Sequence, residues 1–212
     1  MSTQTVSKQT LSRLPQYLSY LESLPDTVRS ISATGIAAAL NLNQVQVRKD
    51  LASVSSSGKP KVGYMRRDLI REIKAFLGYD NADEAVIVGA GKLGRALMGY
   101  TGFRDYGLNI LAAFDASEDV IGEDENGRPI MPIEVLKETC QRLNVHIGII
   151  TVPASAAQAV CDQLIDAGVL AIWNFAPVRL VVPEGILAQH ENMASALAIL
   201  SNHLAEKLNG QR

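Results

Sequence analysis

A glycine-rich segment directly after an apolar run constrains this sequence more than any other feature. The β-rich run at 85–88 is followed at once by Gly89, Ala90, Gly91, Lys92, Leu93 and Gly94. This is the pattern GxGxxG between a predicted strand and a predicted helix, the context that distinguishes a dinucleotide-binding βαβ unit from a chance match. The first glycine permits a tight turn, the second lets the backbone approach a pyrophosphate, and the third allows close packing of helix on strand.

An acidic residue ends the next predicted strand. That strand covers 109–114, and Asp115 follows Gly94 at about 20 residues, the spacing typical of the ribose-binding acid. Its carboxylate can accept hydrogen bonds from ribose hydroxyl groups and would repel a 2′-phosphate. Neither Ala116 nor Ser117 supplies an arginine for such a phosphate. The sequence therefore favours NADH and NAD+ over NADPH and NADP+, which carry the 2′-phosphate.

Strands and helices continue to alternate after this unit. Residues 130–132 are expected to lead into a helix over 133–143, followed by a strand at 146–152, a helix at 155–167 and a strand at 170–173. This alternation predicts a parallel sheet covered on both faces. Ligands of such sheets bind at the carboxyl ends of the strands. The residues expected to face the nicotinamide are therefore Thr151, Val152, Pro153, Asn174 and Phe175.

The first 80 residues have a different pattern. Helices are predicted at 10–24, with Pro15 in the first turn, at 32–40 and at 44–54, with Ser32 and Asn43 as caps. The second and third are joined by a three-residue turn, the outline of a helix-turn-helix. A polar stretch at 55–61 and a short strand at 62–64 predict a hairpin wing, and a fourth helix at 67–77 closes the domain.

Charge separates the two parts of the chain. Residues 1–80 carry 11 Lys/Arg and 6 Asp/Glu, whereas residues 81–212 carry 9 Lys/Arg and 16 Asp/Glu. A basic N-terminal part indicates a polyanionic partner for that part alone. Gln and Arg can read base edges, and Lys contacts phosphate. The predicted DNA-binding residues are Gln44, Gln46, Arg48 and Lys49 on the third helix, and Lys59 and Lys61 in the wing.

Several classes of protein are disfavoured. No apolar run reaches the roughly 18 residues that span a membrane, and the N-terminus has no export-signal core. Cys140 and Cys161 lack CxxC spacing, and His146, His190 and His203 form no metal-binding pattern. We expect a cytoplasmic protein without metal ligands or catalytic residues.

The pairing of a winged helix with a Rossmann fold in one short chain resembles the Rex family of redox-sensing repressors. The resemblance runs from about residue 10 to 208, and the runs 46–51 and 174–177 are its most specific segments. The segments that carry it are 13–15, 46–51, 58–64, 89–94, 114–115 with 121–122, 151–153 and 173–177. The predicted fold class is α/β with an N-terminal winged helix, a Rossmann doubly wound parallel sheet and a C-terminal helix.

This resemblance implies a mechanism. It divides the chain into a DNA-binding domain at 1–80, an NAD(H)-binding domain at 81–190 and a dimerisation helix at 191–212. It implies a homodimer in which each C-terminal helix is swapped onto the partner, and a palindromic double-stranded operator. NADH would release the DNA. Arg48 and Lys49 would contact DNA, and Tyr100 would lie near the nicotinamide of one subunit.

The chain departs from the family at the residues that couple the domains. Alignment places Ser19 at the position of an arginine on the first helix, and Asn192 at that of an aspartate before the last helix. Neither can form an ion pair. We therefore hypothesise a switch based on neutral hydrogen bonds, including one between Tyr100 and Asn192. The wing also has Lys61 where the family has glycine.

Two other functions are compatible with parts of the pattern. An NAD-dependent enzyme would need a proton-transfer group beside the nicotinamide, but His146 falls at the start of a strand, and the chain leaves little room for a substrate domain. A constitutive DNA-binding protein could use the Rossmann domain only for dimerisation. Such a protein would show no saturable NADH binding.

Overall fold

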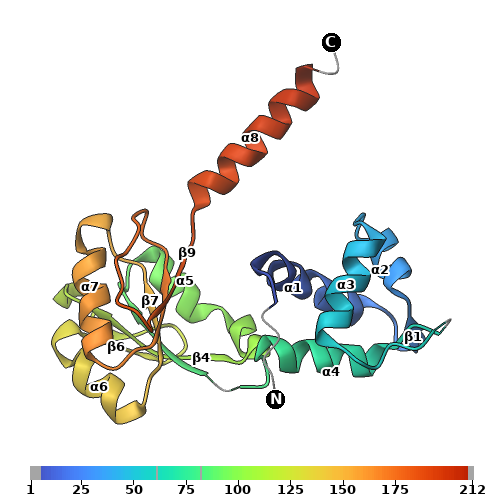
Figure 1. Cartoon of the computed structure of the whole chain (residues 1–212). Helices are drawn as coiled ribbons and strands as arrows, with labels where there is room; N and C mark the ends of the chain where they lie inside the picture. The colour runs from blue at the N-terminus through green and yellow to red at the C-terminus, as the bar shows by residue number, and fades with distance from the viewer. Residues whose placement is uncertain (1–5, 61, 82, 210–212) are drawn as a thin grey trace. The chain divides into compact units, whose positions relative to one another are not determined.

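The computed structural model describes residues 6–60, 62–81 and 83–209, and it divides into two compact units (Figure 1). One unit holds the residues up to Asn81 together with Asp105–Gly107, and the other holds the rest. In the first unit the helices are α1 (Lys8–Ser23), α2 (Ala33–Ala39), α3 (Gln44–Val54) and α4 (Arg66–Leu77), and the strands are β1 (Ser30–Ile31) and β2 (Tyr64–Met65).

The predicted helix-turn-helix is confirmed, together with both of its caps. The Ser32 hydroxyl accepts the Gly35 N–H at 3.0 Å, and the Asn43 carboxamide oxygen accepts the N–H groups of Val45 and Gln46. Between the helices Asn41 has a φ of 53°, a left-handed conformation that asparagine tolerates. These local bonds define where α3 begins.

The position of Pro15 was predicted wrongly. The Ser7 hydroxyl caps α1 by accepting the Thr10 N–H, so the helix begins at Lys8 and Pro15 lies well inside it. Proline has no N–H to donate to the preceding turn. The helix continues because one face, including Leu14, Tyr17 and Leu18, is buried in the core of the unit.

The wing also differs from its prediction. The strand begins at Tyr64 rather than at residue 62, and its partner is β1, which was not predicted. Among the wing residues that the structure describes, Lys59 and Gly63 form an isolated antiparallel bridge. Gly63 has a φ of 82°, and a Cβ there would collide with the Ile31 carbonyl oxygen. A two-residue strand is too short to produce a recognisable sequence pattern.

The second unit is built on a seven-stranded sheet in the order β5-β6-β4-β3-β7-β8-β9, parallel except for β5. Without β5, this is the strand order of doubly wound nucleotide-binding folds. The strands are β3 (Asp83–Val88), β4 (Leu108–Asp115), β5 (Gly122–Glu123), β6 (Pro129–Pro132), β7 (Ile147–Ile150), β8 (Ala171–Asn174) and β9 (Leu187–His190). The helices are α5 (Lys92–Gly99), η2 (Glu118–Val120), η3 (Ile133–Val135), α6 (Leu136–Leu143), α7 (Ala154–Asp166) and α8 (Met193–Asn209). The 3₁₀ helix η1 (Thr101–Tyr106) begins in this unit and ends in the first.

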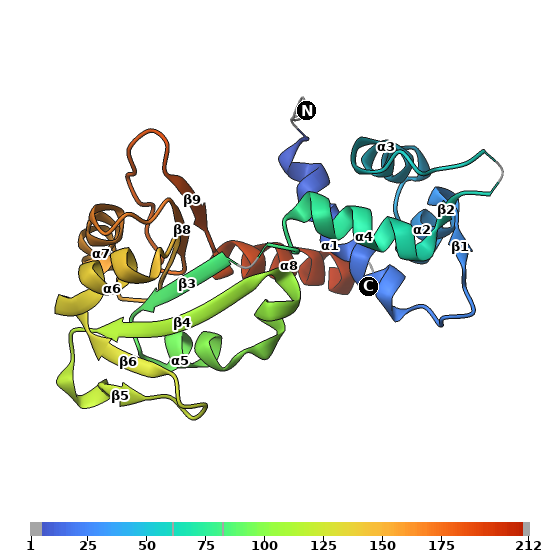
Figure 2. The same ribbon diagram turned by 90° about the horizontal axis from the view of Figure 1, so that it is seen from below.

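The central strand β3 is buried on both faces. Val86 and Val88 belong to the core beneath α6 and α7, whereas Ala85 and Ile87 belong to the core beneath α5. Figures 1 and 2 show α5 on the opposite side of the sheet from α6 and α7. This arrangement explains why the strand is apolar from Ala85 to Val88, after the polar Asp83 and Glu84 at its start.

Three short strands of this sheet, β5, β6 and β9, were missed. Residues 130–132 were expected to lead directly into a helix, but they lie in β6, which pairs with β4 and β5. The helix itself begins as the 3₁₀ turn η3. No strand was predicted at β9, which extends the sheet beyond β8. β6 has only four residues with proline at each end, and β9 alternates between exposed and half-buried residues, so neither has a strong strand pattern.

The predicted terminal helix is confirmed as α8. None of its residues is buried, although Leu197, Leu200, Leu204 and Leu208 follow one another at helical spacing. A helix with an exposed apolar stripe requires a partner surface to bury it.

Candidate functional site

The glycine-rich loop lies at the carboxyl end of β3. Gly89 has a φ of 107°, and a Cβ there would come within 2.9 Å of Thr151. A Cβ on Gly94 would collide with the Gly89 carbonyl oxygen, whereas a Cβ on Gly91 would meet nothing within 4 Å. Gly89 is thus required by the turn and Gly94 by the close approach of α5 to the Gly89 carbonyl oxygen, whereas Gly91 leaves open space at the N-terminus of α5. Lys92 and Leu93 follow, exposed on the first turn.

Asp115 closes this loop from the neighbouring strand. Its carboxylate accepts the Ala90 N–H at 2.6 Å and the Ser117 N–H at 2.9 Å. Asp115 ends β4, so it lies beside the glycine loop as its spacing predicted. A bound ribose would compete with these two backbone N–H groups for the same oxygens.

Two further side chains hold the loop in place. The Thr151 hydroxyl donates to the Gly89 carbonyl oxygen at 2.7 Å. The Arg95 guanidinium donates to the carbonyl oxygens of Ala90 at 3.0 Å and Val120 at 3.1 Å. The sequence analysis missed Arg95, whose only signal was an arginine in the first turn after the glycine motif.

The loops after β7 and β8 lie at the same edge of the sheet. Val152 is half-buried and Pro153 precedes α7, while Phe175 donates its N–H to the Ile150 carbonyl oxygen. Asn174 is fully buried, and its carboxamide bonds Ala176, Val178 and His190. Its side chain therefore shapes the loop from inside.

Tyr100 is not brought to the glycine loop of its own chain. It caps the C-terminal end of α5, whereas Gly91 caps the N-terminal end. An eight-residue helix separates the two by about 12 Å. Tyr100 is 53% exposed, so its ring is open to a partner surface.

The third helix, α3, presents its predicted DNA-binding residues outward. Gln44, Gln46, Arg48 and Lys49 are exposed, while Val47 is buried in the core. Of the two predicted wing residues, Lys59 is exposed beside the Lys59–Gly63 bridge. Lys61 lies outside the described residues.

A buried carboxylate joins α3 to α1. Asp50 is 2% exposed and accepts hydrogen bonds from Thr10, Arg13, Tyr17 and Gln46. Arg13 binds it in a bidentate manner, at 2.7 and 2.9 Å. Burial raises the pKa of Asp50, but the hydrogen bonds from Arg13, Tyr17, Gln46 and Thr10 outweigh it, and the pKa is lowered overall.

The pKa of Tyr17 shifts in the opposite direction to that of Asp50. Burial and the hydrogen bond to Asp50 raise the pKa of Tyr17 to about 12, so its hydroxyl remains a donor. Gln46 donates one amide N–H to this carboxylate, which leaves its carboxamide oxygen available on the exposed side. Sequence analysis had assigned Gln46 to DNA alone.

The described residues offer little for metal or thiol chemistry. They contain no group of three or more His, Cys, Asp or Glu residues that could hold a metal ion. Cys140 and Cys161 are buried free thiols, and burial raises the pKa of Cys140 to about 11. No helix in the described part of the chain is long and apolar enough to cross a membrane.

Two known families match separate parts of the chain. Residues 5–52 match a family described as the N-terminus of a putative DNA-binding protein. Residues 80–178 match the CoA binding domain family.

Relatives of known function cover almost the whole chain. The redox-sensing transcriptional repressor Rex of Porphyromonas gingivalis is 42% identical over 94% of this chain and 92% of its own length. That of Bacteroides fragilis is 39% identical over 94% and 91%. The structure of RSP, a Rex-family repressor, with β-NAD+ and operator DNA is 31% identical, with a TM-score of 0.90 over 98% of this chain and 96% of that one. The same protein with β-NADH has a TM-score of 0.88 over 98% of both chains. The chain belongs to the Rex family of redox-sensing transcriptional repressors.

Proposed function

We propose that this protein binds operator DNA through its N-terminal unit and is released when NADH binds to the Rossmann unit. The observation that carries the proposal is the loop from Gly89 to Gly94, open at Gly91 and closed by Asp115. The DNA-binding part of the proposal is supported by α3, which has an exposed polar face and is held to α1 by the buried Asp50 on its other face. Relatives solved with β-NADH, and with β-NAD+ and operator DNA, support both halves.

Each part of the nucleotide has residues to receive it. The pyrophosphate would lie at Gly91 and the N-terminus of α5, where free N–H groups and the helix dipole favour negative charge. Asp115 would accept the ribose hydroxyl groups. Val152 and Phe175 would lie beside the nicotinamide. An apolar surface favours the neutral reduced ring over the cationic oxidised one, since burying a charge is costly.

On the DNA, Arg48 would read base edges, joined by Gln44 and by the free oxygen of Gln46. Lys49, Lys59 and Lys61 would contact the phosphate backbone. Assigning 1–80 to DNA, 81–190 to NAD(H) and 191–212 to dimerisation follows from these roles.

The exposed stripe of α8 supports a homodimer in which this helix packs on the partner. Two copies of α3 related by a two-fold axis would read a palindromic operator. A repressor of chromosomal genes in a bacterium acts in the cytoplasm. No catalytic residue has a role in this mechanism.

The size of the response sets a physical requirement. NADH can shift the DNA-binding equilibrium only by its differential affinity for the two states. A change from 1:99 to 99:1 requires a preference of roughly 10⁴, which is about 5.5 kcal/mol.

The experiment is fluorescence anisotropy of labelled DNA from the gene's own promoter, at constant salt because salt alone changes the affinity. NADH, NAD+, NADPH and CoA are titrated separately into the complex. Release by NADH, with little effect of NAD+ or NADPH, supports the proposal. CoA is included because residues 80–178 match a family named for it. DNA binding that ignores all four nucleotides would identify a constitutive DNA-binding protein.

A further inference from the structure

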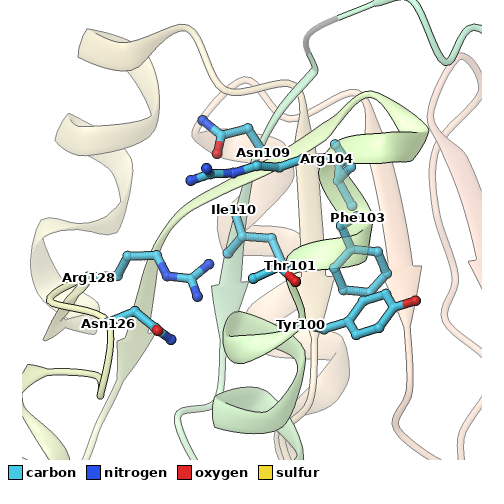
Figure 3. Close-up of a pocket in the computed structure, with 9 residues that line it drawn as sticks. Tyr100, Thr101, Phe103, Arg104, Asn109, Ile110, Asn126 and Arg128 are labelled. Atoms are coloured by element: carbon cyan, nitrogen blue, oxygen red, sulfur yellow. The ribbon is translucent and has the colours of Figure 1, made fainter.

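A cavity lies in the Rossmann unit, away from the glycine loop. Its volume is about 260 Å³, and Figure 3 shows the side chains that line it. Its walls come from the segment after α5, the first residues of β4 and the turn between β5 and β6. Its polar lining residues are Thr101, Arg104, Asn109, Asn126 and Arg128.

This cavity and the glycine loop lie at opposite edges of the sheet. The glycine loop follows the last residues of β3, whereas the cavity is lined by Leu108, Asn109 and Ile110 at the start of β4. β3 has six residues and β4 has eight, and the two strands are parallel. The start of β4 therefore lies a full strand length from the end of β3. A molecule in the cavity would therefore not occupy the proposed pyrophosphate position.

Two arginines face this space. Figure 3 shows the guanidinium groups of Arg104 and Arg128 on the same side of the cavity, above and below one another. Within the described ranges, no carboxylate lies in ion-pair distance of Arg104. One of the two charges is thus uncompensated by any ion pair there.

The other arginine is held in its orientation. The Nε of Arg128 donates to Asp124 at 3.2 Å, and Asp124 also accepts the backbone N–H groups of Asn126 and Arg128. Asp124 is 5% exposed and Arg128 21% exposed. Because only Nε is used, the terminal nitrogens of Arg128 remain as donors toward the cavity.

The remaining lining is also organised. The Asn109 carboxamide donates one N–H to Glu84 at 3.0 Å, which fixes its plane. Asn126 and Thr101 add a carboxamide and a hydroxyl group. Ile110 is 4% exposed and forms an apolar wall. The cavity thus combines fixed donors with an apolar surface, the composition typical of a site for a small organic molecule.

We propose that this cavity binds a small organic anion, through a phosphate or carboxylate group held by Arg104 and Arg128. Guanidinium groups bind these planar or tetrahedral oxyanions in a bidentate manner. The carbon part of the ligand would lie against Ile110. This site would allow the protein to sense a second metabolite besides the dinucleotide.

An aromatic row provides an optical signal for the site. Tyr100 lines the cavity and packs edge-on against Phe103, with ring centroids 4.9 Å apart. Phe103 packs against Trp173 at 5.7 Å, and Trp173 against Phe175 at 4.9 Å. Trp173 is the single tryptophan of the chain, so its fluorescence reports on the surroundings of this row.

The experiment is isothermal titration calorimetry of the full chain with inorganic phosphate and, separately, with malonate, at constant ionic strength. Trp173 fluorescence is recorded in parallel. The test variant is Arg104→Gln, and the matched control is Arg142→Gln, which removes an equal charge from an exposed position on α6. NADH binding to both variants is measured as a check on the dinucleotide site.

We expect one saturable site per chain for at least one of the two anions. Arg104→Gln should weaken its affinity by about tenfold or more, as expected for the loss of charged hydrogen bonds, and Arg142→Gln should leave it unchanged. Phosphate binding alone would assign the ligand a phosphate group, and malonate binding alone a carboxylate.

Two results would overturn the proposal. One is the absence of saturable binding of both anions to the unaltered protein. The other is binding that survives Arg104→Gln, which would place the anion elsewhere, for example at the glycine loop. Failure of NADH to bind would contradict the proposed function but not this site, since the two lie at opposite edges of the sheet.

Discussion

At the scale of a residue, the buried charge of Asp50 connects the stability of the N-terminal unit with the proposed DNA recognition. It lies on the helix that carries the proposed DNA-reading residues, yet its side chain is buried and accepts five hydrogen bonds. Removing one partner of a buried ion pair leaves the other without compensation. Asp50 therefore stabilises the N-terminal unit and holds α3 against α1 by the same contacts.

The substitution Asp50→Asn should lower the free energy of unfolding by about 3 kcal/mol, because an amide cannot accept from Arg13, Tyr17 and Thr10 together. Urea unfolding followed by circular dichroism measures this change. Asp68→Asn is the control, because its ion pair with Arg71 is exposed and worth about 0–1 kcal/mol. Equal losses in the two variants would contradict the role of Asp50.

The lowered pKa of Asp50 predicts the direction of a pH dependence. Its folded-state pKa is below the usual 3.8, so the stabilisation is fully present above that value and is lost as the pH falls through the lower folded-state pKa. The protein should therefore lose stability in acid below about pH 4. Asp50→Asn should reduce this loss in urea titrations at a series of pH values. An identical pH profile for the variant would exclude Asp50 as its source.

Substitution by alanine at two glycines of the nucleotide loop should affect two different properties, NADH affinity at Gly91 and stability at Gly94. A Cβ on Gly94 collides with backbone, whereas one on Gly91 meets nothing within 4 Å. Gly91→Ala should fold with unchanged thermal stability and lose NADH affinity, since its methyl group would occupy the space for the pyrophosphate. Gly94→Ala should lower the stability itself. Differential scanning fluorimetry and NADH titration separate the effects, and a Gly91→Ala protein that binds NADH normally would place the pyrophosphate elsewhere.

At the scale of an element, Asn192 has a role that the sequence analysis did not include. Its carboxamide oxygen accepts the Ser195 N–H at 2.9 Å, so it caps α8. Loss of such a cap costs about 1 kcal/mol. Any effect of Asn192 on the NADH response therefore has two sources, the cap and the hypothesised hydrogen bond to Tyr100.

Two substitutions distinguish these sources. Asn192→Ala removes both the cap and the carboxamide, whereas Asn192→Ser keeps a capping oxygen but lacks the reach to Tyr100. If the hydrogen bond to Tyr100 contributes to the switch, both variants should need more NADH to release DNA in the anisotropy assay. A wild-type response of Asn192→Ser would reduce the role of Asn192 to capping.

At the scale of the whole molecule, the proposed dimerisation through α8 would link assembly to DNA binding. Its exposed leucines are expected to be buried in a homodimer, and two linked DNA-binding units bind a palindrome far more tightly than one. Leu200→Glu with Leu204→Glu should give a monomer in analytical ultracentrifugation and weaken operator binding. The charge-matched control is Ser195→Glu with Asn202→Glu, away from the stripe. A dimer that persists in the leucine variant would show that another surface holds it together.

The sequence by itself determined the features that depend on a few neighbouring residues. Gly89 has the positive φ of its turn, Gly94 lies against the Gly89 carbonyl oxygen, and Ser32 and Asn43 cap helices within their own first turn. Periodic apolar positions indicated the helices of both units and the central strands. These features are local, because backbone sterics and i to i+3 contacts do not require the rest of the chain.

Only the tertiary structure decided what depends on residues distant in the sequence. It placed Asp50 against Arg13, buried Asn174 within its own loop, added β6 and β9 to the sheet and brought Arg104 to the same cavity as Arg128. Short strands such as β6 and β9 form because a neighbouring strand supplies hydrogen-bond partners, and a buried polar group is stable only where folding delivers its partners. No local pattern records which distant residue that partner will be.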